Sequence, residues 1–336
     1  MRLRPTMQAA IALLLVILSC ASLPGVAGAP APTTVKVAFT PLQAWGPLFI
    51  AEHEGFFARE GIKIEWATFA GGADTIAVLI QGSLDVGAGA ASAGFFNAIA
   101  RGEQVRIVAD KGYAAPGSRA VALVARKNLR PGGTPTIADL KGRRIAVNTL
   151  GAVAHYLVGR YLAKGGLTLN DVDIVRMPFP AMIPALQQGA VDAANLSEPF
   201  VSQAVETGAG VLMMAAGDVA PDEPIAYIFY GPNFLTRSPD VARRFMVAYV
   251  RALRQYAAGP TDRNVRIVAD YTKIGADVIK KGDWFPMRAD GAVNVNAIRR
   301  FQDWLYEQQL IGVRMPVGSV VDATFLTHAA GVLVAR

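Results

Sequence analysis

The stretch Leu79-Ile80-Gln81-Gly82-Ser83-Leu84-Asp85 returns later in the chain as Leu186-Gln187-Gln188-Gly189-Ala190-Val191-Asp192. Each copy predicts a helix that ends at a glycine, because glycine readily takes the left-handed conformation found there. A short apolar strand follows each helix, over 84–88 and 191–194, and runs into a new helix start. The repetition favours an α/β protein of two similar lobes, with a ligand cleft at the carboxyl ends of the strands. Two unrelated strand-turn-helix junctions are the alternative.

The N-terminus has the features of a secretory signal peptide over residues 1–29. Arg2 and Arg4 precede an apolar stretch from Ala9 to Leu18, and small residues follow near Ala29. The apolar stretch is shorter than the roughly 20 residues that a membrane span needs. We therefore expect an exported, periplasmic protein.

Cys20 is the only cysteine of the chain, so no internal disulfide can form. It follows Ile17-Leu18-Ser19, which resembles a bacterial lipobox. Cleavage before Cys20 would leave a lipid-anchored protein on a proline-rich tether over 21–33. Cleavage near Ala29 would release the protein, and the small residues there favour this outcome slightly.

The composition indicates a globular protein with no nucleic-acid partner. The chain is 52% hydrophobic, and the roughly 300 residues after the signal peptide are enough for two domains. The formal net charge of +7 falls to about +5 without Arg2 and Arg4. The basic residues form scattered pairs such as Arg143-Arg144 and Lys280-Lys281, which is typical of solvated helix faces rather than of a basic stripe.

Strands and helices alternate from Val35 onwards. We expect four strands that form one parallel sheet, over 35–39, 62–68, 84–88 and 105–110. We expect a second run of strands over 120–125, 145–148, 172–177, 191–194 and 211–214. We expect a further apolar strand over 225–230 that returns the chain to the first lobe.

The alternation predicts two lobes joined by two chain crossovers. We assign residues 34–115 and 228–336 to a discontinuous lobe 1 and residues 116–227 to lobe 2. The C-terminal part is mostly helical, over 239–258, 262–274 and 294–309. These helices have no new sheet to cover, so we expect them to pack on lobe 1.

Five segments of the chain resemble one known family. They are Val35 to Phe39, Pro47 to Ile62, Gly82 to Asp85, Asp139 to Val147 and Asn195 to Pro199. In this order they are similar to substrate-binding proteins of bacterial ABC importers for nitrate, alkanesulfonates, taurine and thiamine-type pyrimidines. The resemblance implies a two-lobed periplasmic-binding-protein fold of type II. It also implies a protein that closes over one small molecule and then docks on membrane permease subunits.

The resemblance does not choose among sulfonates, nitrate, aromatic acids, pyrimidines and flavins as ligands. Gln43 and Trp45 follow the first predicted strand, so they are candidates to project into the cleft. An indole in that place can stack on a planar ligand. Packing of Trp45 beneath the loop is the alternative.

Two predicted helix starts supply further candidate ligand contacts. Ala91 and Ser92 open a helix in lobe 1, and Thr149 and Gly151 open one in lobe 2. Two facing helix N-termini would suit an anionic head group, because both offer unpaired N–H donors. Simple N-capping is the alternative for Ser92. Asn148 ends a strand at the same level, where its amide could contact ligand or hold a turn.

The orientation of Glu198 bears on the class of ligand. In the cleft its carboxylate would repel sulfonate or nitrate and favour a ligand with N–H donors. At a helix start it would instead favour the helix dipole, which is the role we prefer. Tyr113 and Tyr227 lie near the predicted crossovers and are candidates for hinge or cleft contacts, with surface packing as the alternative. Lys111 follows a strand, where it would pair with an anion or be solvated.

No motif predicts a catalytic residue, a metal or a cofactor. His53, His155 and His328 lack metal-ligand spacing, and the chain contains neither a Gly-x-Ser-x-Gly elbow nor a P-loop. The thiamine-pyrimidine synthases that share the implied fold carry a cysteine-rich iron motif, which one cysteine cannot supply. An exported sensor module that hands its ligand to a receptor would have the same features. We expect a monomer that is not an enzyme.

Overall fold

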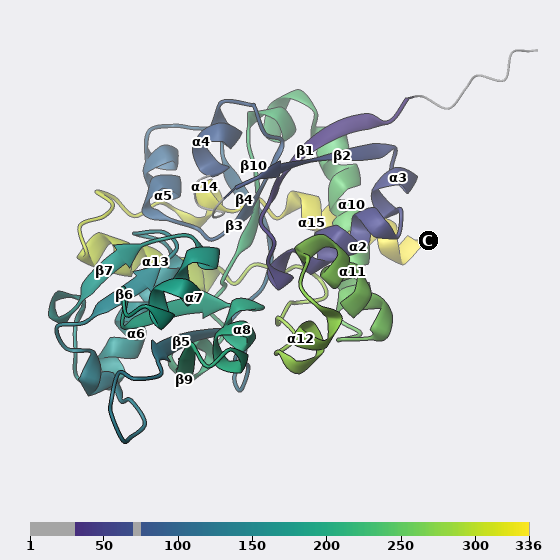
Figure 1. Ribbon diagram of the computed structural model, residues 1–336. Helices are drawn as coiled ribbons and strands as arrows, with labels where there is room; N and C mark the ends of the chain where they lie inside the picture. The colour runs from purple at the N-terminus through teal and green to yellow at the C-terminus, as the bar shows by residue number, and fades with distance from the viewer. Residues whose placement is uncertain (1–30, 70–74, 336) are drawn as a thin grey trace, which may run out of the picture. The chain divides into compact units, whose positions relative to one another are not determined.

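The computed structural model describes residues 31–69 and 75–335. The predicted signal peptide over 1–29, with Cys20, lies outside the described residues. Strands and helices alternate through most of the described chain and build two five-stranded sheets (Figure 1). Within the described ranges, every helix is too short or too polar for a transmembrane span.

The two sheets have the same topology. The first contains, in spatial order, β2 (Ile62–Thr68), β1 (Thr33–Phe39), β3 (Val86–Gly89), β10 (Tyr227–Tyr230) and β4 (Arg106–Asp110). The second contains β7 (Asp173–Arg176), β6 (Arg144–Val147), β8 (Ala193–Ser197), β5 (Val121–Arg126) and β9 (Gly210–Ala215). The second strand of each order, β1 or β6, pairs in parallel with both neighbours. The fourth, β10 or β5, pairs antiparallel with both neighbours.

The prediction of one parallel sheet from the first four strands is wrong at one place. β10 lies between β3 and β4 and runs antiparallel to both, so β3 and β4 are not neighbours. All four residues of β10 are buried. A central position in the sheet satisfies the backbone hydrogen-bonding groups of such a buried strand on both sides. In sequence, β10 comes after all five strands of the second sheet.

The duplicated phrase has the same backbone form in both copies. Gly82 and Gly189 have φ angles of 76° and 68°, which confirms the predicted left-handed glycines after α4 (Thr75–Ile80) and α7 (Phe179–Gln187). The strands that follow, β3 and β8, begin two residues later than predicted. Each begins directly after the aspartate of the phrase.

Helices pack around both sheets. Those next to strands of the first sheet are α2 (Gly46–His53), α3 (Phe56–Arg59), α4 and α5 (Ala93–Ala100). Those of the second sheet are α6 (Val153–Lys164), α7, α8 (Phe200–Glu206) and α9 (Ala216–Val219). The C-terminal helices are α10 (Pro239–Tyr256), α11 (Asp262–Thr272), α12 (Ala276–Lys281), α13 (Val295–Glu307), α14 (Val317–Val320) and α15 (Thr324–Ala335). Single turns of tighter or wider helix span Gln43–Trp45, Ile137–Leu140, Leu169–Asp171 and Asn233–Arg237.

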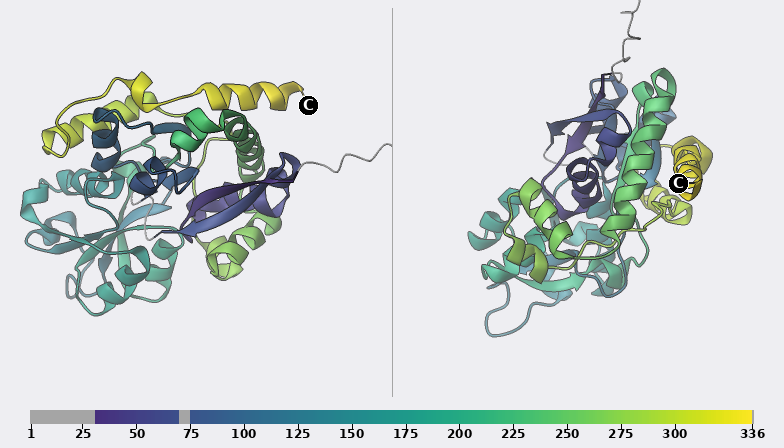
Figure 2. Two further views of the ribbon diagram at one scale, coloured as in Figure 1. Left: turned by 90° about the horizontal axis from the view of Figure 1, so that it is seen from above. Right: turned by 90° about the vertical axis from the view of Figure 1, so that its right-hand side faces the viewer.

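The C-terminal helices pack on helices of the first sheet as predicted, but α13 also packs on a helix of the second sheet, which was not predicted. α10 contacts α2 and α15 (Figure 2), and α11 contacts α2. In α13, however, the ring of Phe301 lies 6.0 Å from Phe96 of α5 and 5.7 Å from Tyr156 of α6. Trp304, one turn later, lies 5.4 Å from Tyr156. Two large rings on one face of α13 therefore bury themselves against helices of both sheets.

Two segments connect the sheets, 111–120 between β4 and β5 and 216–226 between β9 and β10. An isolated antiparallel bridge joins Tyr113 to Pro224, so these two crossovers run side by side. The exact limits of the lobes, 34–115 with 228–336 and 116–227, stay a prediction.

Candidate functional site

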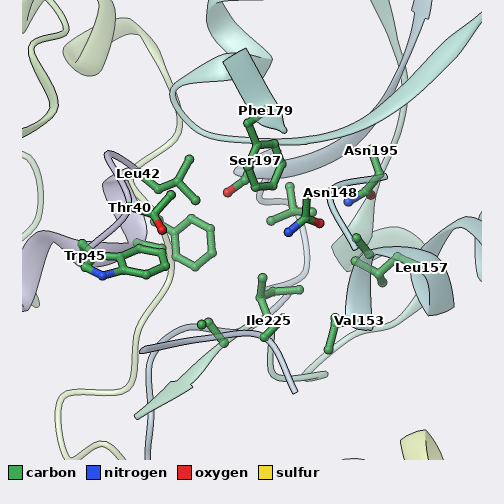
Figure 3. A pocket seen from close by; sticks show the side chains of 17 residues that line it. Thr40, Leu42, Trp45, Asn148, Val153, Leu157, Phe179, Asn195, Ser197 and Ile225 are labelled. Carbon is green, nitrogen blue, oxygen red and sulfur yellow. The ribbon is translucent and has the colours of Figure 1, made fainter. Parts of the chain in front are cut away.

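A cavity lies where strands of both sheets end (Figure 3). Thr40 follows β1 and Ala90 follows β3 in the first sheet. Asn148 follows β6 and Ser197 ends β8 in the second sheet. The space between the atoms is about 550 Å³, part of it open to solvent. Open α/β sheets bind ligands at this end of their strands.

Most of the cavity wall is apolar. Its aromatic members are Trp45 from the turn after β1, Phe179 at the start of α7 and Phe285 in the loop after α12. Aliphatic side chains such as Leu157 and Ile225 fill much of the remaining wall. Burial of the apolar body of a ligand against such a wall lowers the free energy of the complex.

Four polar side chains face this apolar wall, namely Thr40, Asn148, Asn195 and Ser197. Thr40 Oγ1 donates to the carbonyl of Phe69 at 3.1 Å. Asn195 is only 3% exposed, and its Oδ1 has no hydrogen-bond partner among the described residues. A buried amide oxygen without a partner is costly, so Asn195 is the polar group of the cavity that most needs one.

The first turn of α6 also lies at the cavity. Val153 and Ala154, its first two residues, line the wall. Their backbone N–H groups have no acceptor in the described part of the chain, as is normal for the first turn of a helix. These N–H groups and the positive end of the helix dipole favour an acceptor or an anion in the cavity.

Trp45 is held by the residues around it. Its Nε1 donates to the carbonyl of Ala38 at 2.9 Å, and Nζ of Lys111 lies 3.3 Å from the centre of the indole. Lys111 is fully buried and donates to the carbonyl of Ala44 at 3.0 Å. Burial lowers the pKa of the Lys111 amine well below its ordinary value, and the Asp110 carboxylate opposes this shift. A solvated Lys111, one of the two sequence alternatives, is therefore wrong.

Gln43 and Glu198 do not line the cavity. Gln43 Oε1 accepts a hydrogen bond from the Phe285 N–H at 3.0 Å. Glu198 is 2% exposed, and its carboxylate accepts from Ser202 Oγ at 2.7 Å and from the Asp283 N–H at 3.4 Å. Burial raises the pKa of Glu198, and the hydrogen bonds from Ser202 oppose this. Glu198 faces a separate pocket, so its contacts support a structural role.

The two predicted helix starts lie together but are bonded to each other. Ser92 and Ala152 form an isolated antiparallel bridge, and the Ala93 N–H donates to the carbonyl of Gly151 at 2.8 Å. Ser92 is the N-cap residue of α5, yet its hydroxyl makes no capping hydrogen bond. The Ala93 N–H at the start of α5 therefore bonds to the second half of the protein and is not free for an anion.

Ala91, Ser92, Thr149 and Gly151 accordingly line no part of the cavity. Thr149 Oγ1 is buried and has no hydrogen-bond partner within the described ranges. As ligand contacts, all four residues stay predictions.

Tyr113 and Tyr227 also lie outside the cavity lining. The guanidinium of Arg288 lies 3.9 Å from the centre of the Tyr113 ring, and it donates to the Asp110 carboxylate at 3.0 Å. Tyr227 is buried in β10, and this burial raises the pKa of its hydroxyl well above the ordinary value. These positions support packing, of Tyr113 at the crossovers and of Tyr227 within the first sheet, more directly than contact with ligand.

Of the ten candidate residues, the structure therefore brings Trp45 and Asn148 to the cavity. The sequence reasoning missed Asn195 and Ser197, which strand alternation would have found, since residues i and i+2 share a face. It also missed Phe179 and Phe285, for which no local signal was present. Within the described ranges, no cluster of three or more His, Cys, Asp or Glu side chains could hold a metal ion.

Comparison with known proteins gives consistent matches. The model of the NMT1-like family matches residues 28–271. The taurine-binding periplasmic protein of Escherichia coli is 29% identical over 217 residues, which is 64% of each chain. A putative aliphatic sulfonates-binding protein of Bacillus subtilis is 26% identical over 298 residues, or 85% of this chain and 86% of its own.

The fold matches that of a solved binding protein. The alkanesulfonate-binding protein SsuA from Xanthomonas axonopodis pv. citri, bound to MOPS, superposes with a TM-score of 0.70 at 24% identity. The match covers 88% of this chain and 99% of that chain. The two-lobed α/β fold predicted from the sequence is thereby confirmed.

Proposed function

The chain belongs to the NMT1-like family, and we propose that it is an exported solute-binding protein of an ABC importer. It captures one small molecule in the cavity and delivers that molecule to membrane permease subunits. Its relatives are named as binding proteins for taurine and for aliphatic sulfonates, which supports the proposal.

One observation carries the proposal, namely that neither sheet forms the cavity alone. Trp45 and Thr40 come from the first sheet, whereas Asn148, Asn195 and Ser197 come from the second. A ligand that contacts both sets would stabilise the arrangement in which the two sheets approach each other. Ligand binding and closure are then one coupled equilibrium.

The two crossovers are the natural hinge for this motion. The two segments lie side by side and are joined by the bridge between Tyr113 and Pro224. Other contacts between the halves, such as the bridge between Ser92 and Ala152, would form only on closure. A small change of backbone angles within 111–120 and 216–226 would then open the cavity.

The proposal includes no chemical conversion of the solute. The relatives named above are binding proteins, and the cavity wall carries amides and hydroxyls but no charged side chain among the described residues. An exported sensor with the same cavity is the second candidate. Loss of solute uptake on gene deletion favours import, whereas loss of a transcriptional response with intact uptake favours sensing.

The proposed location is the periplasm, with cleavage of residues 1–29 and a monomeric mature protein. The relative from Escherichia coli is named as periplasmic. A lipid anchor on Cys20 is the alternative to free release, and mass spectrometry of the mature protein separates the two.

The test is a thermal-shift screen of the mature chain followed by calorimetry. The screen covers sulfonates, nitrate, aromatic acids, pyrimidines and flavins, because a ligand that binds only the folded state raises the melting temperature. We expect one class to bind with one molecule per chain and to be recovered unchanged. Absence of binding by every class, or formation of a product, would overturn the proposal.

A matched pair of variants locates the binding site. Ile225→Trp fills the cavity and should abolish binding, since Ile225 lines its wall. Leu150→Trp is the control, because Leu150 is 50% exposed and lies outside the lining. Equal affinities of the two variants would place the solute elsewhere.

A further inference from the structure

The two crossovers are hydrogen-bonded to each other at the hinge. The Ala114 N–H donates to the carbonyl of Glu223 at 2.8 Å, and the Ile225 N–H donates to the carbonyl of Gly112 at 2.7 Å. The crossovers therefore form one short antiparallel ribbon, which must turn as a unit when the two halves of the protein separate. We call this pair of segments, 111–114 and 222–226, the hinge ribbon.

The hinge ribbon forms part of the cavity wall. Ile225 and Ala226 of the ribbon line the cavity, as does Phe285. Gly112 has a φ angle of 123°, and a side chain in its place would meet the Phe285 ring at 2.2 Å. Phe285 thus packs directly on the backbone of the ribbon. A solute that fills the cavity therefore contacts both the ribbon and the ring that packs against it.

The loop that carries Phe285 is anchored to the first half of the protein. Trp284 Nε1 donates to the carbonyl of Tyr256 in α10 at 3.1 Å, and the two rings stack with their centres 4.3 Å apart. Further along the loop, the carbonyl of Gly291 accepts from the Asp110 N–H in β4 at 2.8 Å. Residues 284–291 therefore stay with the first sheet when the hinge ribbon turns.

Arg288 lies on this loop and joins the first sheet to both strands of the hinge ribbon. Its guanidinium donates to the carboxylate of Asp110, at the end of β4, at 3.0 Å. The same group lies 3.9 Å from the centre of the Tyr113 ring on the first crossover and 3.6 Å from the carboxylate of Asp222 on the second. A planar guanidinium suits this place, because it can stack on a ring and still donate within its own plane.

The three contacts of Arg288 differ in how they depend on the hinge. Asp110 is 1% exposed and belongs to β4, so its pair with Arg288 stays with the first sheet. Tyr113 and Asp222 belong to the hinge ribbon, so rotation of the ribbon moves them relative to Arg288. These two contacts are therefore complete only at the hinge angle at which both sheets form the cavity.

We propose that Arg288 is a positioning residue for solute binding, which clamps both crossovers to the end of β4 and so holds the hinge at the angle that closes the cavity. Arg288 does not line the cavity and acts through the hinge ribbon. Phe285, three residues earlier on the same loop, links the clamp to the solute. This inference rests on the proposed function, because closure serves binding only if the solute lies between the two sheets.

The experiment follows opening of the mature chain, without solute, by amide hydrogen exchange measured with NMR. The Ala93 N–H donates to the Gly151 carbonyl of the other half, so it exchanges when the halves separate, even if the open form is rare. The Asp192 N–H bonds to Arg144 within the second sheet and serves as the reference for global unfolding. In the wild type we expect both N–H groups to be protected from exchange.

Asp222→Asn removes the charge that meets Arg288 on the second crossover. Asparagine tolerates the left-handed backbone of residue 222, whose φ is 61°, so the variant should keep its fold. We expect the Ala93 N–H to exchange about twofold faster, since partly exposed ion pairs contribute little. High salt should have the same effect on the wild type and none on the variant. Asp240→Asn is the control, because Asp240 pairs with Arg243 within α10, and it should change nothing.

Arg288→Lys keeps a positive charge beside Asp110 but loses the planar group that stacks on Tyr113. The Ala93 N–H should exchange at least about fivefold faster, which is the effect of losing one cation–π contact. Exchange of the Asp192 N–H should stay the same. Arg130→Lys is the control, because Arg130 pairs with Asp139 within the second half, and it should leave both rates unchanged.

The outcomes separate this inference from the proposed function. An unprotected Ala93 N–H in the wild type, or an unchanged rate in either variant, overturns the clamp. An equal rise for Ala93 and Asp192 overturns it as well, because it indicates a loss of global stability. Absence of binding by every compound of the screen counts against the proposed function, whereas the exchange rates need no solute and test Arg288 on their own.

Discussion

The carboxylates of Asp85 and Asp192 make the same backbone hydrogen bond at equivalent places in the two sheets. Asp85 accepts from the N–H of Lys36 in β1 at 2.8 Å, and Asp192 accepts from the N–H of Arg144 in β6 at 3.0 Å. The backbone N–H of each aspartate returns a bond to the carbonyl of the same partner. The last residue of the duplicated phrase therefore ties each central strand to its parallel neighbour.

This relationship predicts a loss of stability in Asp192→Ala. Asp192 is 7% exposed and also accepts from Arg126 at 3.0 Å, so its removal leaves two donors unpaired. We expect the free energy of unfolding to fall by about 2 kcal/mol, measured by urea denaturation. Asp173→Ala is the control, because Asp173 is exposed, and it should change the value by less than about 0.5 kcal/mol. Equal losses in both variants would contradict the structural role of Asp192.

The sequence predicts those parts of the fold that depend on local pattern. Gly82 and Gly189 end helices, and apolar strands follow them, because both features are set by a few adjacent residues. The position of β10 could not be predicted in this way. Its neighbours β3 and β4 lie more than a hundred residues away in sequence, and only the assembled sheet selects between them.

The sequence also predicts the part of the candidate site that directly follows strands. Trp45 and Asn148 follow β1 and β6, and the rule that ligands bind at strand ends selects them. Phe285 reaches the cavity from a loop after α12, so no pattern near the strands indicates it. Glu198 also directly follows a strand, β8, but the hydrogen bonds from Ser202 hold its carboxylate away from the cavity.

Trp45→Phe should weaken binding of the solute found in the screen. Trp45→Ala is the less useful change, because Trp45 is 2% exposed and its truncation should cost about 3–5 kcal/mol of stability. Phenylalanine keeps a ring but loses contact area and the bond to Ala38. We expect a loss of about three- to tenfold in affinity by calorimetry. Trp304→Phe, in α13 and outside the lining, should leave affinity unchanged, and an unchanged Trp45→Phe would remove Trp45 from the site.

Asn195→Leu should separate stability from binding. Its amide oxygen is buried without a partner among the described residues, so an apolar side chain of similar size should keep or raise the melting temperature of the free protein. Affinity should fall at least about tenfold. Asn264→Leu is the matched control, because Asn264 is equally buried but donates to Gln255 and Gly259. It should lower the melting temperature and spare affinity, and the reverse pattern would refute the assignment.

Arg119→Ala should favour the open form. Arg119 precedes β5 in the second sheet and donates to Asp283, in the loop after α12, at 3.1 Å. Exposed ion pairs contribute roughly 0.5 kcal/mol, so we expect about a twofold loss of affinity that disappears at high salt. Calorimetry at two salt concentrations measures it. Arg130→Ala breaks a pair with Asp139 within the second half and should have no effect, so equal losses would argue against a contact that depends on closure.

The pair between Glu54 and Arg263 should make stability depend on pH in the acid range. Hydrogen bonds from Arg263 lower the pKa of Glu54 from 4.5 to about 2. Because the folded state binds this proton less readily than the unfolded state, the stabilisation is present above pH 4.5 and is lost as the pH falls towards 2. Arg263 is largely exposed, so solvent screening reduces the effect to about 1 kcal/mol at pH 7.

Arg263→Gln tests this dependence by urea denaturation between pH 7 and pH 2.5. The variant should be less stable than the wild type at pH 7, and the difference should shrink steadily below pH 4.5 as the Glu54 carboxylate becomes protonated. Arg254→Gln is the control, because Arg254 is an exposed arginine of α10 with no ion pair in the described chain. Its difference from the wild type should stay constant with pH. A constant difference for Arg263→Gln as well would mean that Glu54 keeps its ordinary pKa in the folded protein.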